Sequence, residues 1–326
     1  MRTTFLTEDQ IWGDYALEVI KKYGTRTGLT DLTVALGGML SEHKTIENDY
    51  AGPVWTASYD STYHVCIAIG HGNRATVAPY FGDLSSRPAL PSSETSKIYP
   101  NAVRKLNTEL GQVKICEYGE YPQDVVFGEL AKELEKNYKH SALQRTGKRY
   151  TFDGNTDDDF SQKIIPERHE EYIFKGSRYV RIKGKPYDRN SVMSDGREVR
   201  TGRPYWFEVK PIEWLMDEQS GIWVAKKALF AGIKFDCKDY NGNFKQTEMR
   251  KYLDNYFSKE MQNSYGNNQR VQKTQNPKNI QTNNPFQVTS TEPPVYEETD
   301  QYHEYENEPS KRQKGYGIQV VEEPLP

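Results

Sequence analysis

The chain has 326 residues, of which 27% are charged and 35% hydrophobic, with a formal net charge of -3. Its mean hydropathy is -0.87, and no apolar stretch approaches the roughly 18 residues that a membrane-spanning helix needs. The first residues also lack the apolar region of a signal peptide, so we expect a cytoplasmic protein with no membrane partner. Cys66, Cys116 and Cys237 are odd in number and widely spaced, which excludes a disulfide framework. We expect buried thiols.

The polar residues are concentrated at the C-terminal end. Residues 261–326 are rich in Asn, Gln, Pro and acidic side chains, which predicts a disordered tail. Six Lys/Arg and nine Asp/Glu lie in this tail, so residues 1–260 hold 37 of each sign and are neutral. A neutral body lowers the expectation of a nucleic-acid partner. Aliphatic residues return in KGYGIQVVEEPLP at 314–326, which indicates a docking strand or the entry to a further domain.

The first predicted element is a helix from Thr7 to Gly24. Thr7 and Gln10 form a capping box there, and apolar residues recur at helical spacing. Residues 31–40 are a short apolar run whose type the periodicity leaves open. Residues 54–58 and 63–70 then alternate with period two, and a GHGN turn leads into the run RATVAPYF. This pattern predicts a sheet rich in hairpins.

The sequence of residues 113–260 predicts many strands and two helices. Residues 113–118 indicate a strand before a turn at 121–124, and Asp124 is the predicted N-cap of a helix that reaches Tyr138. From residue 166 onward, turn signals separate short runs that predict a twisted antiparallel sheet. Thr247 precedes a last amphipathic helix. Helices packed on many short strands indicate the α+β class. The predicted strands after residue 166 are 170–174, 178–183, 204–209, 211–217 and 222–230.

Two motifs resemble ligand-binding loops but are incomplete. Residues 70–75 (GHGNRA) fit the outline of a dinucleotide loop, but a strand-like run follows instead of a helix, so we interpret them as a hairpin turn. Four residues at alternate positions resemble the first half of a calcium loop, although its sixth and twelfth positions do not match. A solvated acidic loop is the better interpretation. These four residues are Asp153, Asn155, Asp157 and Asp159.

Catalytic groups do not form a recognisable set in the sequence. The six histidines show no metal-ligand spacing, and Cys66 lies in an alternating apolar strand without an adjacent cation. Phosphate-binding loops and nucleophile elbows are missing as well. We therefore expect no metal and no cofactor, and a binding protein is better supported than an enzyme.

The window from Trp55 to Phe81 has an unusual composition. It mixes tyrosines with Asp, Asn, Ser, His and Arg in a chain that holds 23 tyrosines. Aromatic residues give a large contact area at little entropic cost, and small polar residues adapt to a partner, as in recognition surfaces. The alternative is that these tyrosines only fill a half-buried sheet.

Several runs resemble a bacterial domain family of unknown function. They are YWFEVKPIEWLMD at 205–217, IWVAKKAL at 222–229, MRKYLDNYF at 249–257 and YGEYPQ at 118–123. A second family feature, a tryptophan, an isolated glycine and a closing RPAL, is similar to Trp55, Gly72 and residues 87–90. The family is related to the formylglycine-generating-enzyme, or C-type-lectin-like, fold. Here the second feature precedes the first, so the order is permuted or two partial modules are joined.

The resemblance implies which residues would bind a ligand. The same fold serves as the variable protein of diversity-generating retroelements, and the Trp55–Arg87 block is similar to its variable region. Trp55 and Arg87 are expected to be scaffold, as are Trp206 and Trp214 in the matched runs. The matching region offers no reactive cysteine pair, so the resemblance implies the fold and not oxidase chemistry. The implied ligand-binding residues are Tyr59, Asp60, Tyr63, His64, His71, Asn73, Arg74 and Tyr80.

These observations predict a non-enzymatic binding module for a protein or glycan ligand. Residues 1–112 are expected to form a helix plus a strand-rich block with the Trp55–Arg87 window, residues 113–260 to form the family-like α+β module, and both to share one composite fold. Two alternatives stay open. One is a metal-dependent oxidase of the formylglycine-generating type. The other is a sensory segment of a larger ATPase protein with a downstream ATPase domain or subunit, because the run at 314–326 is similar to the entry of such domains.

Overall fold

The computed structural model describes residues 2–60, 64–80, 84–154, 163–237 and 240–262, and the backbone of the strand at 319–320. The fold is mixed α+β with more strand than helix, so the predicted class is confirmed. The helical elements are α1 (Glu8–Ile11), α2 (Glu18–Tyr23), α3 (Asp31–Ala35), α4 (Ser92–Thr95), α5 (Gly128–Lys139), the 3₁₀ turn η1 (Phe244–Gln246), α6 (Glu248–Tyr252), the π-helical turn η2 (Leu253–Phe257) and α7 (Ser258–Glu260).

The larger sheet is organised around one long strand. β12 pairs with β8 along one edge and with β11 and β13 along the other, all antiparallel. β10 and β9 extend the sheet beyond β11, β6 pairs with β13, and β7 pairs with β8. The strands of this sheet are β6 (Ala89–Leu90), β7 (Asn101–Thr108), β8 (Gly111–Val125), β9 (Gln144–Asp153), β10 (Pro166–Phe174), β11 (Ser177–Lys183), β12 (Pro204–Met216) and β13 (Trp223–Ala225).

The smaller sheet contains the aromatic window. Its order is β15-β5-β2-β3-β4-β16, and the predicted hairpins β2–β3 and β3–β4 are confirmed. The backbone of β16 pairs antiparallel with β4, in agreement with the docking strand expected near the C-terminus. β1 and β14 form a separate parallel pair. The strands are β2 (Val54–Tyr59), β3 (Val65–Ala68), β4 (Arg74–Val77), β5 (Ser85–Ser86), β15 (Phe230–Ala231) and β16 (Gln319–Val320), with β1 (Gly28–Leu29) and β14 (Lys227–Ala228) in the pair.

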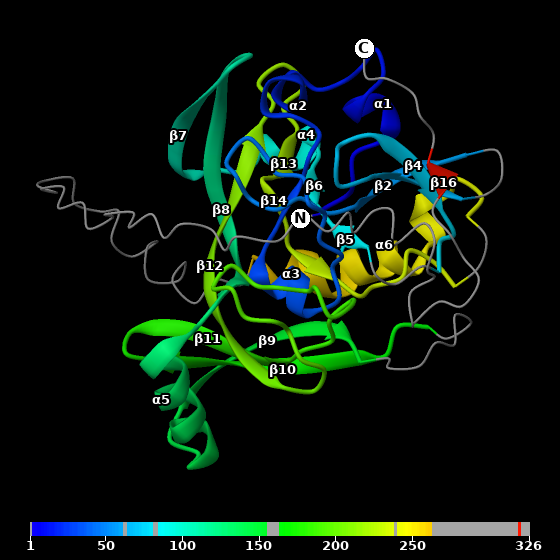
Figure 1. Ribbon diagram of the computed structural model, residues 1–326. Helices are drawn as coiled ribbons and strands as arrows, with labels where there is room; N and C mark the ends of the chain where they lie inside the picture. The colour runs from blue at the N-terminus through cyan, green and yellow to red at the C-terminus, as the bar shows by residue number, and fades with distance from the viewer. Residues whose placement is uncertain are drawn as a thin grey trace, which may run out of the picture.

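The helices connect the two sheets. Figure 1 shows the small sheet beside β6 and β13, with β9, β10 and β11 below it and α3 and α6 between. α3 contacts β8 of the larger sheet and β15 of the smaller one, and η2 contacts β9. The two ends of the described body also meet, because the Oγ1 atom of Thr3 lies 2.7 Å from the Oγ of Ser258 in a buried hydrogen bond.

The single helix predicted over 7–24 is wrong, because two short helices replace it. The capping box is present: the Gln10 N–H donates to Thr7 Oγ1, and the Thr7 N–H donates to Gln10 Oε1 at 2.9 Å. The chain turns after α1, and the Trp12 indole donates to the Gly72 carbonyl at 2.9 Å. At Gly13 an added Cβ would lie 2.7 Å from Asp9 Oδ1, so the turn is too tight for a side chain.

Two predicted breaks in the larger sheet are also wrong. The turn expected at 121–124 lies inside β8, where Pro122 pairs with Val209. Asp124 lies in β8, where its side chain forms an ion pair with Lys210, and it does not cap a helix. Helix α5 begins only at Gly128. The two strands expected at 204–209 and 211–217 are the single strand β12. Register shifts in the β8–β12 pair absorb the prolines, since a bulge removes the need for a proline N–H.

The run at 222–230 was expected to be one strand and is three. β13 joins the larger sheet, β14 pairs with β1, and β15 joins the smaller sheet. This short segment therefore crosses between all three groups of strands. The predicted turn over Lys175 and Gly176 and the N-cap at Thr247 are confirmed. Cys66 and Cys116 are buried free thiols as expected, whereas Cys237 is only half-buried.

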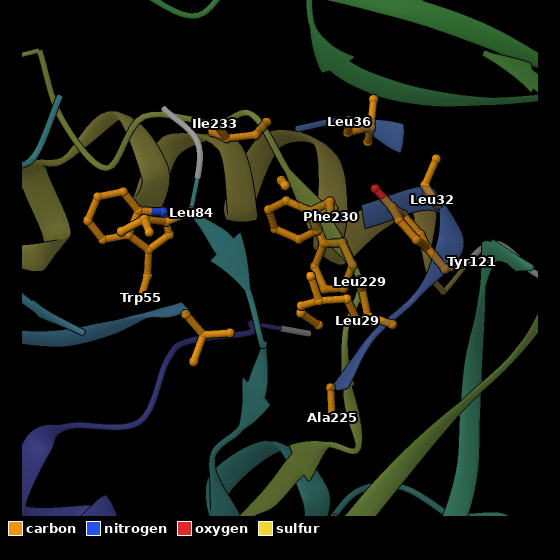
Figure 2. Close-up of a cluster of buried hydrophobic side chains, with 14 of the residues drawn as sticks. Leu29, Leu32, Leu36, Trp55, Leu84, Tyr121, Ala225, Leu229, Phe230 and Ile233 are labelled. Carbon is orange, nitrogen blue, oxygen red and sulfur yellow. The ribbon is translucent and has the colours of Figure 1, made fainter. Parts of the chain in front are cut away.

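The main core draws on both predicted segments, 1–112 and 113–260. Trp55 of β2, Leu32 of α3, Tyr121 of β8 and Phe230 of β15 belong to one buried cluster, which Figure 2 shows. The Tyr121 and Phe257 rings meet edge to face with centroids 5.1 Å apart. Aromatic contacts of this kind add stability beyond the area that they bury.

The expected scaffold tryptophans of the larger sheet are buried and hydrogen-bonded. The Trp214 indole donates to the Tyr118 carbonyl at 2.8 Å, and the Trp206 indole donates to Glu135 Oε2 at 3.2 Å. Trp206 also packs with Tyr138 of α5, which fixes this protruding helix on β12. Burial with the indole N–H paired is what a structural tryptophan requires.

Asp31 joins three parts of the chain. It is buried at the start of α3. Its carboxylate accepts the Val125 N–H at 2.9 Å, and it accepts both the N–H and the hydroxyl of Ser194 at 2.7 Å. Burial raises the pKa of this carboxyl group, and the three donated hydrogen bonds oppose that shift. The carboxylate thus holds the end of β8 and the loop before β12 against α3.

We predict that Asp31→Ala lowers the free energy of unfolding by about 2–4 kcal/mol, because it leaves the buried N–H of Val125 without an acceptor and removes two further hydrogen bonds to Ser194. Urea denaturation checks this value. Asp14→Ala, at an exposed aspartate, is the matched control and should change stability by under about 0.5 kcal/mol. A loss below about 1 kcal/mol in Asp31→Ala would contradict the role given to this carboxylate.

Candidate functional site

The structure separates the expected ligand-binding residues into two groups at opposite ends of the small sheet. Val65 pairs with both Tyr59 and Val77, so the β2–β3 loop and the residues after β4 share one end. This end holds Tyr59, Asp60, His64 and Tyr80. His71 and Asn73 lie in the β3–β4 turn at the other end, beyond the Ala68–Arg74 pair. Tyr63 lies outside the described residues.

We name the first group, together with Tyr240, the tyrosine end. Tyr59 is 46% exposed, and its ring meets that of Tyr240 edge to face at 5.6 Å. The buried Tyr240 hydroxyl donates to the Ala57 carbonyl at 2.9 Å. Gly242 has φ +82°, and an added Cβ would lie 2.3 Å from the Tyr59 ring, so only glycine lets this loop close over Tyr59.

Two hydrogen bonds join Asp60 to His64 beside Tyr59. The Asp60 N–H donates to the His64 carbonyl, and the His64 N–H donates back to Asp60 Oδ1, both at 3.0 Å. The Asp236 N–H donates to the Pro79 carbonyl at 2.9 Å, which joins the segment before Tyr80 to the segment before Tyr240. The three segments that follow β2, β4 and β15 therefore meet at the tyrosine end.

A buried aromatic group supports the tyrosine end from inside. Phe235 lies 5.2 Å from Trp55, 4.9 Å from Tyr240 and 5.5 Å from Phe244 between ring centroids. Trp55 is 2% exposed and lies in the interior. An exposed ring on such a base loses little further freedom when it contacts a ligand.

The opposite turn is packed against the N-terminal segment. The His71 carbonyl accepts from Arg26 Nε at 3.3 Å, and the His71 ring lies 5.2 Å from that of His43. Gly72 has φ +95°, and an added Cβ would lie 2.3 Å from Thr25 Oγ1. His71 and Asn73 therefore do not share a surface with the tyrosine end.

Arg74 forms an ion pair with α1. Its Nε lies 2.6 Å from Glu8 Oε1, and its Nη2 lies 3.7 Å from the sulfur of Cys66. The expectation that Cys66 has no adjacent cation is therefore wrong. Burial and the Glu8 carboxylate nevertheless raise the pKa of the Cys66 thiol to about 12. The thiol stays protonated at neutral pH, so it is a poor nucleophile.

Arg87 is buried between the sheets. Its Nε donates to the Ala225 carbonyl at 2.7 Å, and its Nη1 donates to Thr27 Oγ1 at 3.0 Å. Burial lowers the pKa of this guanidinium to about 10, which keeps it charged at neutral pH. Arg87 thus connects β13 to the segment before β1.

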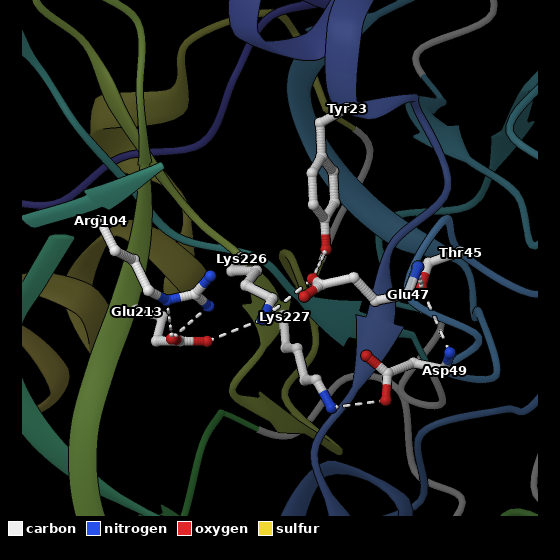
Figure 3. Close-up of polar contacts among 8 residues, drawn as sticks. All are labelled: Tyr23, Thr45, Glu47, Asp49, Arg104, Glu213, Lys226 and Lys227. Atoms are coloured by element: carbon white, nitrogen blue, oxygen red, sulfur yellow. Dashed lines mark hydrogen bonds and ion pairs between the residues drawn. The ribbon is translucent and has the colours of Figure 1, made fainter. Parts of the chain in front are cut away.

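Figure 3 shows a chain of ion pairs that the sequence did not reveal. Lys226 is buried and lies 2.9 Å from Glu47 and 2.8 Å from Glu213. Glu47 also accepts from the Tyr23 hydroxyl at 2.7 Å, and Glu213 pairs with Arg104 at 2.7 Å. The chain links α2 and the loop before β2 to strands β12 and β7. Each charge has a partner, so we assign it a structural role.

Two further buried ionisable side chains, Lys148 and Glu260, lie at strand β9 of the larger sheet. The Lys148 Nζ is buried above the Tyr150 ring, 4.8 Å from its centroid, with no hydrogen-bond acceptor among the described residues. Burial lowers the pKa of Lys148 to about 8. Glu260 of α7 accepts the N–H and the hydroxyl of Thr151, and burial raises the pKa of Glu260 to about 7. Both groups change protonation near neutral pH.

Glu260 gives the fold a pH dependence of known sign. Its folded pKa of about 7 exceeds the ordinary value of 4.5, so the folded state keeps a proton that the unfolded chain releases. The stability that this proton contributes is complete below the unfolded pKa and is lost as the pH rises through about 7. It amounts to about 2–3 kcal/mol.

We predict that Glu260→Gln removes this dependence, because glutamine fills the same space without titrating. Urea unfolding at about pH 5 and about pH 8 should show a wild-type loss that exceeds the variant's loss by about 2 kcal/mol. Glu129→Gln, at an exposed glutamate of α5, is the control and should behave as the wild type. Equal losses in all three proteins would show that Glu260 does not hold the proton.

Metal ligands do not gather in the part of the chain that the structure describes, where no three His, Cys, Asp or Glu side chains are placed to hold an ion. Asp153 of the acidic loop accepts the Ile165 N–H at 3.0 Å, and Asn155, Asp157 and Asp159 lie outside the described residues. The run 70–75 is a turn followed by strand β4, as expected.

No helix among the described residues has the length and apolar character to cross a bilayer. The chain matches no family model, and neither a curated protein nor a solved structure is significantly similar to it.

Proposed function

We propose that the protein is a non-enzymatic binding module that recognises a protein or glycan ligand through the tyrosine end. The observation that carries the proposal is the convergence of three loops, after β2, β4 and β15, around the exposed ring of Tyr59. Loops held by a rigid sheet are where binding residues concentrate in proteins. A cytoplasmic location and a C-type-lectin-like arrangement with a permuted order belong to the same proposal, supported by the sequence resemblance.

The chemistry of the tyrosine end suits recognition. Tyr59 offers an aromatic face and a hydroxyl, while Asp60 and His64 offer an acceptor and a group that can donate or accept. His71, Asn73 and Arg74 belong to the other end or to an ion pair with α1, so we leave them out of the proposed surface. Arg74 is therefore unsuitable for testing binding alone, because its loss would leave Glu8 without its cation.

The test uses the full chain and two panels of probes, a printed glycan array and a displayed peptide library. We expect capture of at least one probe class, and we expect Tyr59→Ala to weaken that capture about tenfold or more. The melting temperature should stay within a few degrees, since the ring is half exposed.

The matched control is Tyr15→Ala, at an exposed tyrosine that is not part of the tyrosine end, which should bind as the wild type does. Equal capture by wild type and Tyr59→Ala would overturn the assignment of the surface. Capture of no member of either panel would count against a binding module for these ligand classes.

A further inference from the structure

The outer edge of β7 is open. β7 pairs with β8 on one side, and no described strand pairs with its other side. Figure 1 shows β7 at the border of the larger sheet. Most of its side chains are exposed. Unpaired N–H and C=O groups along such an edge can accept a further strand.

The edge carries positive charge that the described residues do not neutralise. β7 holds Arg104 and Lys105 and no acidic residue. Arg104 is paired with Glu213 at 2.7 Å, but Lys105 is directly opposite Lys114 in the β7–β8 register. Lys114 pairs with Glu218, whereas Lys105 has no ion pair among the described residues. Like charges directly opposite one another destabilise a strand pair.

Apolar side chains accompany this charge. Val103 on β7 is 53% exposed, Tyr99 just before β7 is 96% exposed, and Leu110 in the β7–β8 turn is 71% exposed. An edge protected only against aggregation would carry charge without such neighbours. A second copy of the chain is a poor occupant, because two β7 strands would bring together two Lys105 side chains that have no ion pair among the described residues.

We propose that the β7 edge is a docking surface for an extended acidic segment of a partner protein, which adds a strand beside β7 and places carboxylates near Lys105. Backbone hydrogen bonds supply most of the attraction in this mode of recognition, and the side chains supply specificity. The surface lies on the larger sheet and is independent of ligand binding at the tyrosine end.

The test uses the full chain and two synthetic peptides, one alternating Val and Glu and one alternating Val and Lys. We expect saturable binding of the Val-Glu peptide and at least about tenfold weaker binding of the Val-Lys peptide. Raising the salt from about 0.05 M to about 0.5 M should weaken the Val-Glu complex. Hydrogen exchange should slow in residues 101–108 alone when this peptide binds.

Lys105→Glu should weaken Val-Glu binding about tenfold. Lys136→Glu, at an exposed lysine of α5, is the matched control and should leave binding unchanged. Equal binding of the two peptides, or no effect of Lys105→Glu, would overturn the proposal. If the peptide binds only after the acidic residues at 297–308 are changed to amides, the occupant is this chain's own tail and the partner assignment is wrong.

Discussion

The antiparallel pairing of β8 with β12 is the constraint on which the rest of the structure depends. β8 has 15 residues and β12 has 13, and their ladder runs from Val125 and Phe207 to Lys114 and Met216. β7 is attached to one side of this pair, and β11 and β13 to the other. The pair also supplies Tyr121 and Trp214 to the core. A change that shifted its register by one residue would turn these side chains out of the core.

The tyrosine end depends on this pair only indirectly. β13 leaves the larger sheet, and after a few residues the same segment becomes β15 of the smaller one, so the core around Phe230 is common to both. Trp55 packs on Phe235, Phe235 packs on Tyr240, and the Tyr240 ring contacts the ring of Tyr59. The recognition surface is thus exposed on one side and fixed to the main core on the other, which favours binding without a large rearrangement.

Local signals predicted local structure well. The caps at Thr7 and Thr247, the hairpins of the window and the turn at Lys175 each depend on neighbouring residues, and all are present. The errors came from long-range pairing: Pro122 and Pro211 look like strand ends, but bulges in the β8–β12 ladder accept them. The contacts that build the candidate site are also long-range, and the sequence did not predict them. No spacing in the sequence indicates that Tyr240 meets Tyr59, or that Glu260 bonds to Thr151, because these pairs form only when the whole chain is folded.

The hydrogen bond between Thr3 and Ser258 has a consequence for how the protein is made. Thr3 bonds to a residue that is synthesised 255 positions later, and the Val19 N–H likewise donates to the carboxylate of Asp217 at 3.0 Å. The N-terminal helices therefore wait, incomplete, until almost the whole body has been synthesised. Contacts of such high sequence separation slow folding, and they lengthen the time for which the apolar surface of the N-terminal segment stays exposed during synthesis.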